Sequence, residues 1–530
     1  MFKGRASHVE SRRRSLSQNS ISSYSSDDPL LGDSPRTGLA EEADEGEAEA
    51  RRINRRIDVA LVPLLSLLYL LNGLDRSNIG NAQTQGFTDD IGVLPDDLNH
   101  AVSLFFVAFV LFQVPSSIVG RWIGPNNWIP IIMFLWGLVT FAHAFIRGRD
   151  QLIAMRVLIG VLEAGFYPTA VAYLASFYRP YDLATRLASF FGMYAIAGAF
   201  SGLLAYGIFQ IDHPELKTWQ LLFILEGTVT CILALAAWAW LPTGPDTAWF
   251  LSKQERSFLV DRVRRDSPES VEVRDRKECS LWQDITETVR DWKPWFMLMC
   301  NICASVPTTA FSVFLPLVVE GMGYSAIEAN LMSVPPAICG AMGLYLFAWS
   351  SDRQAERGYH IMAAIVLALS GLVVVICSGS NDIKYVGLCV FLFGSYAPPS
   401  LTVAWLSDNT PRPGQRAVVL GVNGLGNLAG VIGSQVFRAE YAPGYRTPFL
   451  TTLAFAAAAL VGYLSYRLTL QAVNKNETHR AAALMEAAAK ASTTTNQRLS
   501  ELGMETTNER QAERTGGAGR ADHQWADYGL

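Results

Sequence analysis

Long apolar blocks recur along the chain and alternate with short polar segments. LVPLLSLLYLLNGL (61–74), AVSLFFVAFVLFQV (101–114) and IMAAIVLALSGLVVVICSG (361–379) each approach the ~20 residues that a helix needs to cross a bilayer. Apolar runs of this length are typical of transmembrane helices. The pattern therefore predicts an all-α membrane protein with twelve transmembrane helices, at 58–80, 97–121, 128–147, 152–175, 186–210, 219–241, 294–319, 327–350, 359–379, 384–406, 415–437 and 447–470.

The predicted spans fall into two groups of six. The sixth and seventh are separated by the polar stretch 243–292, whereas the other connections are short. Two six-helix halves are one way in which transporters build two lobes around a site at the membrane midplane. We therefore expect two pseudo-symmetric lobes, with the chain divided into a disordered cytoplasmic tail (1–56), an N-terminal lobe (57–242), a cytoplasmic central loop (243–292), a C-terminal lobe (293–470) and a second cytoplasmic tail (471–530).

The composition agrees with this assignment. Charged residues make up 17% of the 530 residues and hydrophobic residues 50%, whereas soluble proteins usually carry nearer ~25% charge. We expect the chain to be embedded in the lipid bilayer as a monomer, without a cofactor or metal and without a nucleic-acid partner. An enzyme is disfavoured, because the sequence contains no serine–histidine, paired-aspartate protease or histidine-rich metal arrangement.

Positive charge predicts the orientation. Arg51, Arg52, Arg55 and Arg56 precede the first span, and the central loop is also rich in lysine and arginine. Cytoplasmic segments carry such an excess of positive charge, so we place both segments in the cytoplasm. Arg147 and Arg149 would then be external, but the summed charge favours the same orientation.

Two apolar stretches contain ionised residues. LDRSNIGNA (74–82) carries Asp75 and Arg76, and RVLIGVLEAGFYP (156–168) carries Arg156 and Glu163. A charged side chain at mid-membrane costs roughly 2.5–3.5 kcal/mol on insertion scales and persists where it is paired, hydrated or functional. These residues therefore predict a polar site inside the bundle, and hence transport.

The chemistry of these side chains suggests a division of roles. Arg156 and Glu163 lie seven residues apart, on one face of a helix. Arginine binds both oxygens of a carboxylate, so we assign substrate binding to Arg76 and proton exchange to Asp75 and Glu163, with Arg156 beside them. The alternative is that these residues are structural ion pairs that hold the helices together.

Further polar and aromatic residues are candidates for the cavity wall. Asn78 lies in the first charged run, and Asn423 and Asn427 lie four residues apart in the eleventh span. Tyr167 and Tyr194 are candidate aromatic wall residues. Interhelical hydrogen bonding is an equally good explanation for the asparagines, and tyrosines often anchor helices at the membrane interface.

Several long motifs carry a resemblance to a known family. In addition to the two charged runs, they are QVPSSIVGRWIGPNNWIPIIMFLWG (113–137), PSLTVAWLSDNTP (399–411) and NGLGNLAGVIGSQVFRAEYAP (423–443). With these motifs, residues 55–470 resemble a major facilitator superfamily transporter, in particular the anion:cation symporter family and its fungal allantoate permease-like branch.

The resemblance implies a rocker-switch carrier, usually proton-coupled, for small organic anions such as allantoate, nicotinate, pantothenate, biotin or sugar acids. In related bacterial sugar-acid carriers the residues that match Asp75, Arg76, Arg156 and Glu163 take the coupling and substrate roles. The resemblance also implies gating positions. Arg121 stands in a degenerate loop motif without its usual acidic neighbour, whereas Asp352 and Arg353 preserve the counterpart in the second half. Leu203 stands where drug–proton antiporters have proline, which argues against drug exchange.

We therefore expect a proton-coupled symporter of a small organic anion in a fungal plasma membrane, with a vacuolar or endosomal membrane as the alternative. An exporter of an endogenous acid or secondary metabolite on the same scaffold is the second hypothesis. A nutrient sensor that does not transport is a third.

Overall fold

The computed structural model describes residues 34–178, 180–266, 281–354, 356–410 and 412–501. Within these ranges the chain forms helices joined by loops, with no strand. The first half contains α2 (Ser34–Gln83), α3 (Phe87–Asp90), α4 (Pro95–Ile123), α5 (Pro125–Ala142), η1 (His143–Phe145), α6 (Arg149–Glu163), α7 (Phe166–Ala175), α8 (Pro180–Ile208) and α9 (Thr218–Trp240).

The segment after α9 contains η2 (Pro245–Thr247), α10 (Lys253–Asp266) and α12 (Leu281–Arg290). The second half contains α13 (Trp292–Glu320), α14 (Ala326–Met332), α15 (Val334–Gln354), α16 (Gly358–Cys377), α17 (Asn381–Ser395), α18 (Ala397–Asp408), α19 (Pro413–Gly424), η3 (Leu425–Leu428), α20 (Ala429–Gly433), η4 (Ala439–Tyr441) and α21 (Arg446–Glu501).

The predicted membrane helices are present. Among the described residues, eleven helical segments are long and apolar enough to cross a membrane, and each overlaps one predicted span. The remaining prediction, 186–210, falls on α8, where the apolar stretch Gly192–Ile208 is shorter. The all-helical membrane fold is therefore confirmed. Four of these spans consist of consecutive helices, with breaks between α6 and α7, between α14 and α15, between α17 and α18, and around η3.

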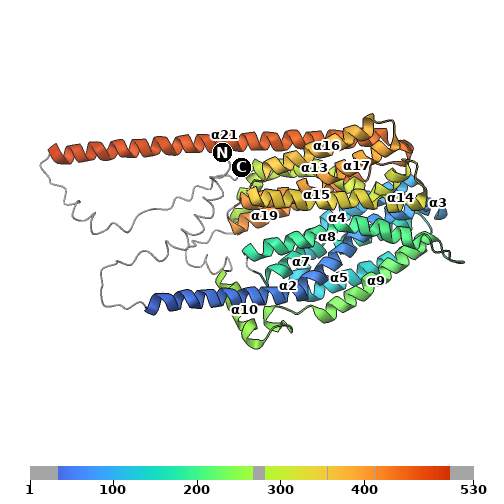
Figure 1. Ribbon diagram of the computed structural model, residues 1–530, viewed down its shortest axis with the longest axis horizontal. Helices are drawn as coiled ribbons and strands as arrows, with labels where there is room; N and C mark the ends of the chain where they lie inside the picture. Colours follow the sequence, from blue (N-terminus) through green and yellow to red (C-terminus); the bar gives the residue numbers. More distant parts are fainter. Residues whose placement is uncertain (1–33, 179, 267–280, 355, 411, 502–530) are drawn as a thin grey trace. The chain divides into compact units, whose positions relative to one another are not determined.

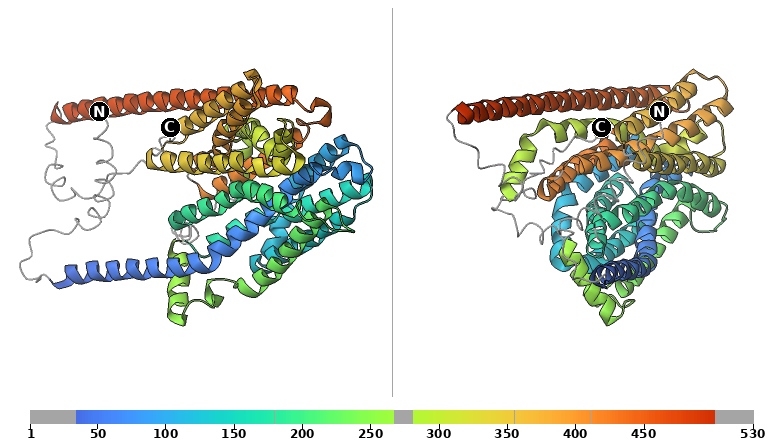
Figure 2. Two further views of the ribbon diagram at one scale, coloured as in Figure 1. Left: turned by 45° about the vertical axis from the view of Figure 1, so that its right-hand side comes forward. Right: turned by 60° about the vertical axis from the view of Figure 1, so that its left-hand side comes forward.

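Residues 53–472 form one compact unit. Within it, the helices of the first half, blue to green in Figure 1, gather in one bundle, and those of the second half, yellow to red, gather in another (Figures 1 and 2). We call these bundles the N-lobe (α2 to α9) and the C-lobe (α13 to α21). The loops alternate between two ends of the unit, which we call the α3 side and the α10 side after the helices that lie there.

Two helices extend beyond this unit into the predicted tails. Helix α2 already begins at Ser34, and α21 continues to Glu501. Among the described residues, 34–52 and 473–501 belong to a separate unit. The stretch EEADEGEAEARR (41–52) is rich in alanine, glutamate and arginine, which are strong helix formers, and this explains the extension of α2. Residues 1–33, 267–280 and 502–530 of the predicted tails and central loop lie outside the described residues.

Candidate functional site

Helix α2 presents the two adjacent ionised residues to different surroundings. The Asp75 side chain is directed into the N-lobe, where its residue is 3% exposed and its Oδ2 accepts a hydrogen bond from Trp136 Nε1 of α5 at 2.9 Å. Its Oδ1 is buried without a hydrogen-bond partner among the described residues. Adjacent residues of a helix point about 100° apart, so Arg76 is directed elsewhere, toward the boundary between the lobes.

Arg76 forms an ion pair within the bundle. Its Nε donates to Glu163 Oε2 of α6 at 3.1 Å, and the Glu163 side chain is fully buried. The guanidinium group also lies over the rings of Phe109 at 4.6 Å and Tyr194 at 5.7 Å. A buried ion pair pays a large desolvation cost, and cation–π contacts of this kind offset part of it. The guanidinium is thus held between one carboxylate and aromatic faces.

Arg156 is the second arginine of the site. It is 3% exposed, and it forms no hydrogen bond with the described residues. It lies close enough to Asp75, Glu163 and Glu226 for electrostatic interaction with all three. A buried guanidinium without a direct partner is costly, so Arg156 is the cation most ready to receive an anion.

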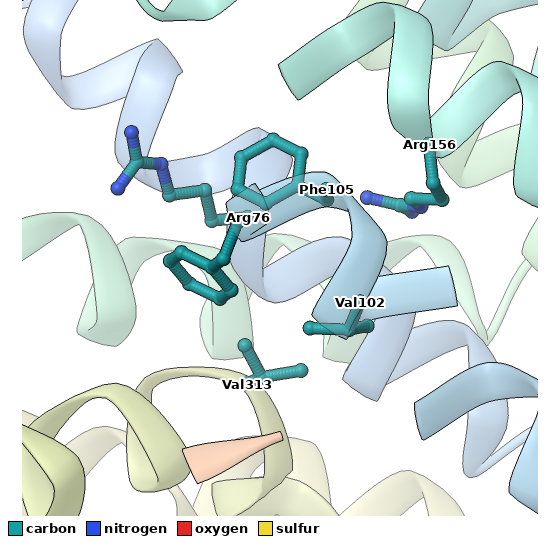
Figure 3. A pocket seen from close by; sticks show the side chains of 6 residues that line it. Arg76, Val102, Phe105, Arg156 and Val313 are labelled. Carbon is teal, nitrogen blue, oxygen red and sulfur yellow. The ribbon is translucent and has the colours of Figure 1, made fainter. Parts of the chain in front are cut away.

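Both arginines line one cavity at the boundary between the lobes. Its walls are Arg76, Val102, Phe105, Phe106, Arg156 and Val313, and the space between them is large enough for about one water molecule. Val313 belongs to α13 of the C-lobe and faces the residues of the N-lobe (Figure 3). Small-molecule sites are largely apolar, with a few charged groups that fix orientation. Two guanidinium groups among apolar walls suit a small anion once the lobes separate and the space widens.

An aromatic cluster adjoins Arg76. The ring of Tyr69 stacks on Phe190 at 4.3 Å between centroids and lies 5.5 Å from Tyr194. Tyr167, from α7, lies 6.1 Å from Tyr69 and 6.4 Å from Phe190. The two predicted tyrosines therefore meet in one cluster, and Tyr194 contacts Arg76 through its ring face.

The predicted asparagines have separate environments. Asn78 is fully buried in α2, and neither its side-chain oxygen nor its nitrogen has a hydrogen-bond partner among the described residues. Asn423 accepts from Asn301 Nδ2 at 3.1 Å, and Asn427 donates to the carbonyl of Gly424 at 2.9 Å. The last two residues thus make bonds within the C-lobe, and none of the three is among the residues that line the cavity.

The lobes contact each other closely on the α3 side. Asn99 Nδ2 of α4 donates to the carbonyl oxygens of Ser434 and Phe437, at 2.5 and 3.1 Å. Ser103 and Ser434 share a hydrogen bond of 2.6 Å between their hydroxyl groups. Asn330 of the C-lobe also donates to Thr84, which follows α2 directly, at 2.9 Å. These bonds close the cavity toward the α3 side.

On the α10 side, charged networks form within each lobe. In the N-lobe, Arg186 pairs with Asp58 at 2.8 Å. In the C-lobe, Arg357 bonds both Asp352 and Asp408, and Arg467 bonds Glu356. Burial disfavours the Arg357 cation, but the two aspartates outweigh it and raise its pKa, so the link remains ionised.

The three predicted gating residues lie at this end. Asp352 is part of the Arg357 network, whereas Arg353 lies over the ring of Trp349 at 5.4 Å. Arg121 is exposed at the end of α4 and forms no ion pair with the described residues. The structure thus shows a direct acid–base link for Asp352 alone among the three.

Two buried titratable residues of the N-lobe were not predicted. Glu226 lies in α9 and is 3% exposed, and His143 lies in η1 and is fully buried. Glu226 interacts electrostatically with Asp75 and Arg156. Its position in the apolar block LLFILEGTVTCILALAAWAWL (221–241) was a usable signal, because it is an acidic residue within a predicted span.

The sequence is similar to those of known membrane transporters. A family model described as Major Facilitator Superfamily matches residues 65–434. The chain is 30% identical to the high-affinity nicotinic acid transporter of Saccharomyces cerevisiae, covering 76% of this chain and 75% of that protein. It is 32% identical to the major facilitator-type transporter hxnP of Emericella nidulans, covering 80% and 86%. An uncharacterized transporter of Schizosaccharomyces pombe is 34% identical, with 78% and 81% covered.

Solved structures share the fold at low sequence identity. A bacterial homolog of the human lysosomal transporter Spinster, in an inward-facing and unoccupied conformation, matches with a TM-score of 0.60 at 16% identity, covering 77% of this chain and 96% of that one. A D-xylose-proton symporter matches with a TM-score of 0.60 at 12% identity, covering 77% and 97%.

Proposed function

The chain belongs to the Major Facilitator Superfamily as a multi-pass membrane transporter, and on this premise we propose that it is a proton-coupled symporter of a small organic anion. Within the superfamily we place it in the anion:cation symporter family, in the allantoate permease-like branch, and in the plasma membrane. The motifs around Asp75, Arg76, Arg156 and Glu163 support the assignment to this family.

The observation that carries the proposal is that Arg76 and Arg156 line one cavity between the lobes. Two guanidinium groups in a confined, largely apolar space favour an anion over a neutral or cationic solute. The apolar and aromatic surroundings, Phe105, Phe106 and the cluster at Tyr194, suit a carboxylate with a planar or apolar body. A heteroaromatic acid such as nicotinate has both features, and a relative is named for nicotinic acid.

Proton coupling is supported by the acids that share the arginines. Glu163 bonds Arg76, and Asp75 interacts electrostatically with Arg156. An arriving anion competes with these carboxylates for the guanidinium groups, because one cation cannot fully satisfy two negative partners. Protonation of Glu163 releases Arg76 for the substrate. Binding of the proton therefore favours binding of the anion, and binding of the anion favours binding of the proton.

The contacts between the lobes support a carrier that alternates access. The α3 side is closed by the bonds of Asn99 and Ser103 with the C-lobe. The arginine-rich segment before the first span lies on the α10 side, which we assign to the cytoplasm. With this orientation these contacts between the lobes lie on the external side.

The proposal is tested by uptake in a yeast strain that lacks its own carboxylate transporters. We expect one member of a panel of radiolabelled carboxylates, with nicotinate first, to accumulate at acidic external pH, and a protonophore to abolish the accumulation. Glu163→Gln should lose accumulation but keep exchange of labelled for unlabelled anion, whereas Glu215→Gln, at an exposed loop, should behave as the wild type. Efflux driven by the proton gradient would instead identify an exporter. Accumulation by Glu163→Gln at the wild-type level would exclude Glu163 as the proton carrier.

A further inference from the structure

A buried polar column extends from Asp75 through the N-lobe, away from the cavity. Helix α5 and η1 contribute Trp136, Thr140 and His143, which are spaced by four and three residues and so share one face. Helix α9 contributes Glu226 and Thr230, which are four apart. Trp136 donates a hydrogen bond to Asp75, whereas the other side chains take no part in the anion site or the proton exchange proposed above.

The carboxyl group of Glu226 is the least satisfied member of this column. Both its oxygens are buried, and neither has a hydrogen-bond partner among the described residues. The helix packing leaves little room for rearrangement: a Cβ placed on the neighbouring Gly227 would lie 2.4 Å from the backbone nitrogen of Phe141. An ionised carboxylate without partners in such a place is very costly, so Glu226 is stable when it carries a proton or when Arg156 faces it.

The charges of the cluster do not balance. Asp75, Glu163 and Glu226 are three acids, and Arg76 and Arg156 are two cations. If all were ionised, one negative charge would be in excess, and a bound monoanion would add a second. Burying net charge in a membrane protein is strongly unfavourable, so the loaded cluster is neutral only with two protons bound. Asp75 or Glu163 accounts for one of them.

His143 lies between Glu226 and the α3 side. Its ring is 5.4 Å from that of Phe223, one turn before Glu226 in α9. Its Nδ1 is 2.8 Å from the carbonyl of Val139, which fixes the hydrogen on Nδ1 and leaves Nε2 as an acceptor. Nε2 is buried and has no partner among the described residues. In the proton path that we propose below, Nε2 takes up a proton from the α3 side and passes it on toward the Glu226 carboxylate, and the ring returns to the same neutral tautomer.

We propose that Glu226 is a second proton-binding site of the carrier, reached from the α3 side past His143. This inference rests on the proposed proton symport, but the site itself is separate from the cavity. The charged groups that interact with it are Asp75 from α2 and Arg156 from α6. Helix α5 contributes the uncharged Trp136 and Thr140 to the column, and His143 of η1 lies near Phe223, one turn before Glu226. In this path a proton passes from water to Nε2 of His143 and then to a carboxylate oxygen of Glu226. No oxidation or reduction takes place.

Proton stoichiometry tests the proposal. In proteoliposomes with the membrane potential clamped to zero, each coupled proton raises accumulation about tenfold per pH unit of gradient. With the carboxylate that the wild type accumulates, Glu226→Gln should lower the final accumulation about tenfold per pH unit of gradient, while exchange of labelled for unlabelled anion continues. Glu226→Asp should restore the wild-type accumulation, and the control Glu215→Gln should leave it unchanged. His143→Gln should slow uptake without changing the final accumulation. An unchanged stoichiometry in Glu226→Gln would overturn the proposal.

A second measurement does not depend on the substrate. Infrared difference spectra of the purified protein during a pH titration should show the carbonyl band of a protonated buried acid, and one component should be missing in Glu226→Gln but present in Glu215→Gln. An identical titrating band in both variants would refute proton binding at Glu226. If the wild type accumulates none of the carboxylates but this component is present, the symport assignment fails while the proton site stands.

Discussion

At the scale of single residues, Arg76 makes two kinds of contact that a lysine cannot reproduce together. Its Nε bonds Glu163 at 3.1 Å, and its planar group lies 4.6 Å from the ring of Phe109. Lysine is a point charge with a compact hydration shell, whereas guanidinium stacks on rings and binds carboxylates through a fork. The geometry of the anion site therefore depends on the guanidinium group itself.

For Arg76→Lys we expect the KM for the transported carboxylate to rise at least roughly tenfold, equivalent to about 1.4 kcal/mol, with normal delivery to the membrane. Initial rates of uptake at several concentrations, together with surface labelling, measure this. Arg147→Lys is the matched control, because Arg147 is exposed on the α3 side. A KM within twofold of the wild type would show that only the charge of Arg76 matters.

At the scale of helices, α2 and α13 approach each other so closely that one residue has no room for a side chain. A Cβ on Gly80 would lie 1.7 Å from the carbonyl oxygen of Val313. Small residues allow such close approach of helix backbones in membranes. Gly80 thus permits closure of the lobes on the α3 side, beside the cavity wall formed by Val313.

We expect Gly80→Ala to prevent this closure and to favour the state that is open on the α3 side, because the added methyl group clashes only when the lobes meet. Uptake should fall at least roughly tenfold, and a cysteine at Thr84 should become more reactive toward a membrane-impermeant thiol reagent. Gly207→Ala is the matched control, since a Cβ there meets nothing within 4 Å. Equal reactivity at Thr84 in both variants would contradict the assignment.

At the scale of the whole membrane unit, the two lobes are joined on the α3 side by residues far apart in the sequence. The hydroxyl groups of Ser103 and Ser434 are 2.6 Å apart, and Gln435 donates to Ser103 at the same distance. On the α10 side, the networks of Asp58 and of Arg357 each remain within one lobe. An alternating carrier must break the first set of contacts in each cycle.

A disulfide at this position should lock the carrier. In a background with the seven native cysteines replaced, we expect Ser103→Cys with Ser434→Cys to cross-link under mild oxidation, because the two side chains are already in contact through their hydroxyl groups. Transport should stop on oxidation and return on reduction, while each single substitution remains active. A cross-linked protein that still transports would exclude separation of the lobes at this point.

Much of the fold and part of the site could be predicted from the sequence. The lengths of the apolar blocks determined the membrane helices, because a helix must satisfy its own backbone in lipid and must match the bilayer thickness. The rarity of charge within these blocks singled out Asp75, Arg76, Arg156 and Glu163, since ionised residues persist in such blocks only for a reason. Glu226 had the same signature, and the sequence could have revealed it as well.

Only the tertiary structure decided which of these groups meet. Spacing along one helix places Arg156 and Glu163 on a common face. Only the packing of α2 against α6 shows that Glu163 pairs with Arg76, and that Arg156 Nε has no hydrogen-bond partner among the described residues. The contacts of Asn99 and Ser103 with the C-lobe likewise join residues more than 300 positions apart in the sequence. Periodicity fixes what faces the interior of a helix bundle, whereas partner choice depends on how separate helices pack, which no local pattern encodes.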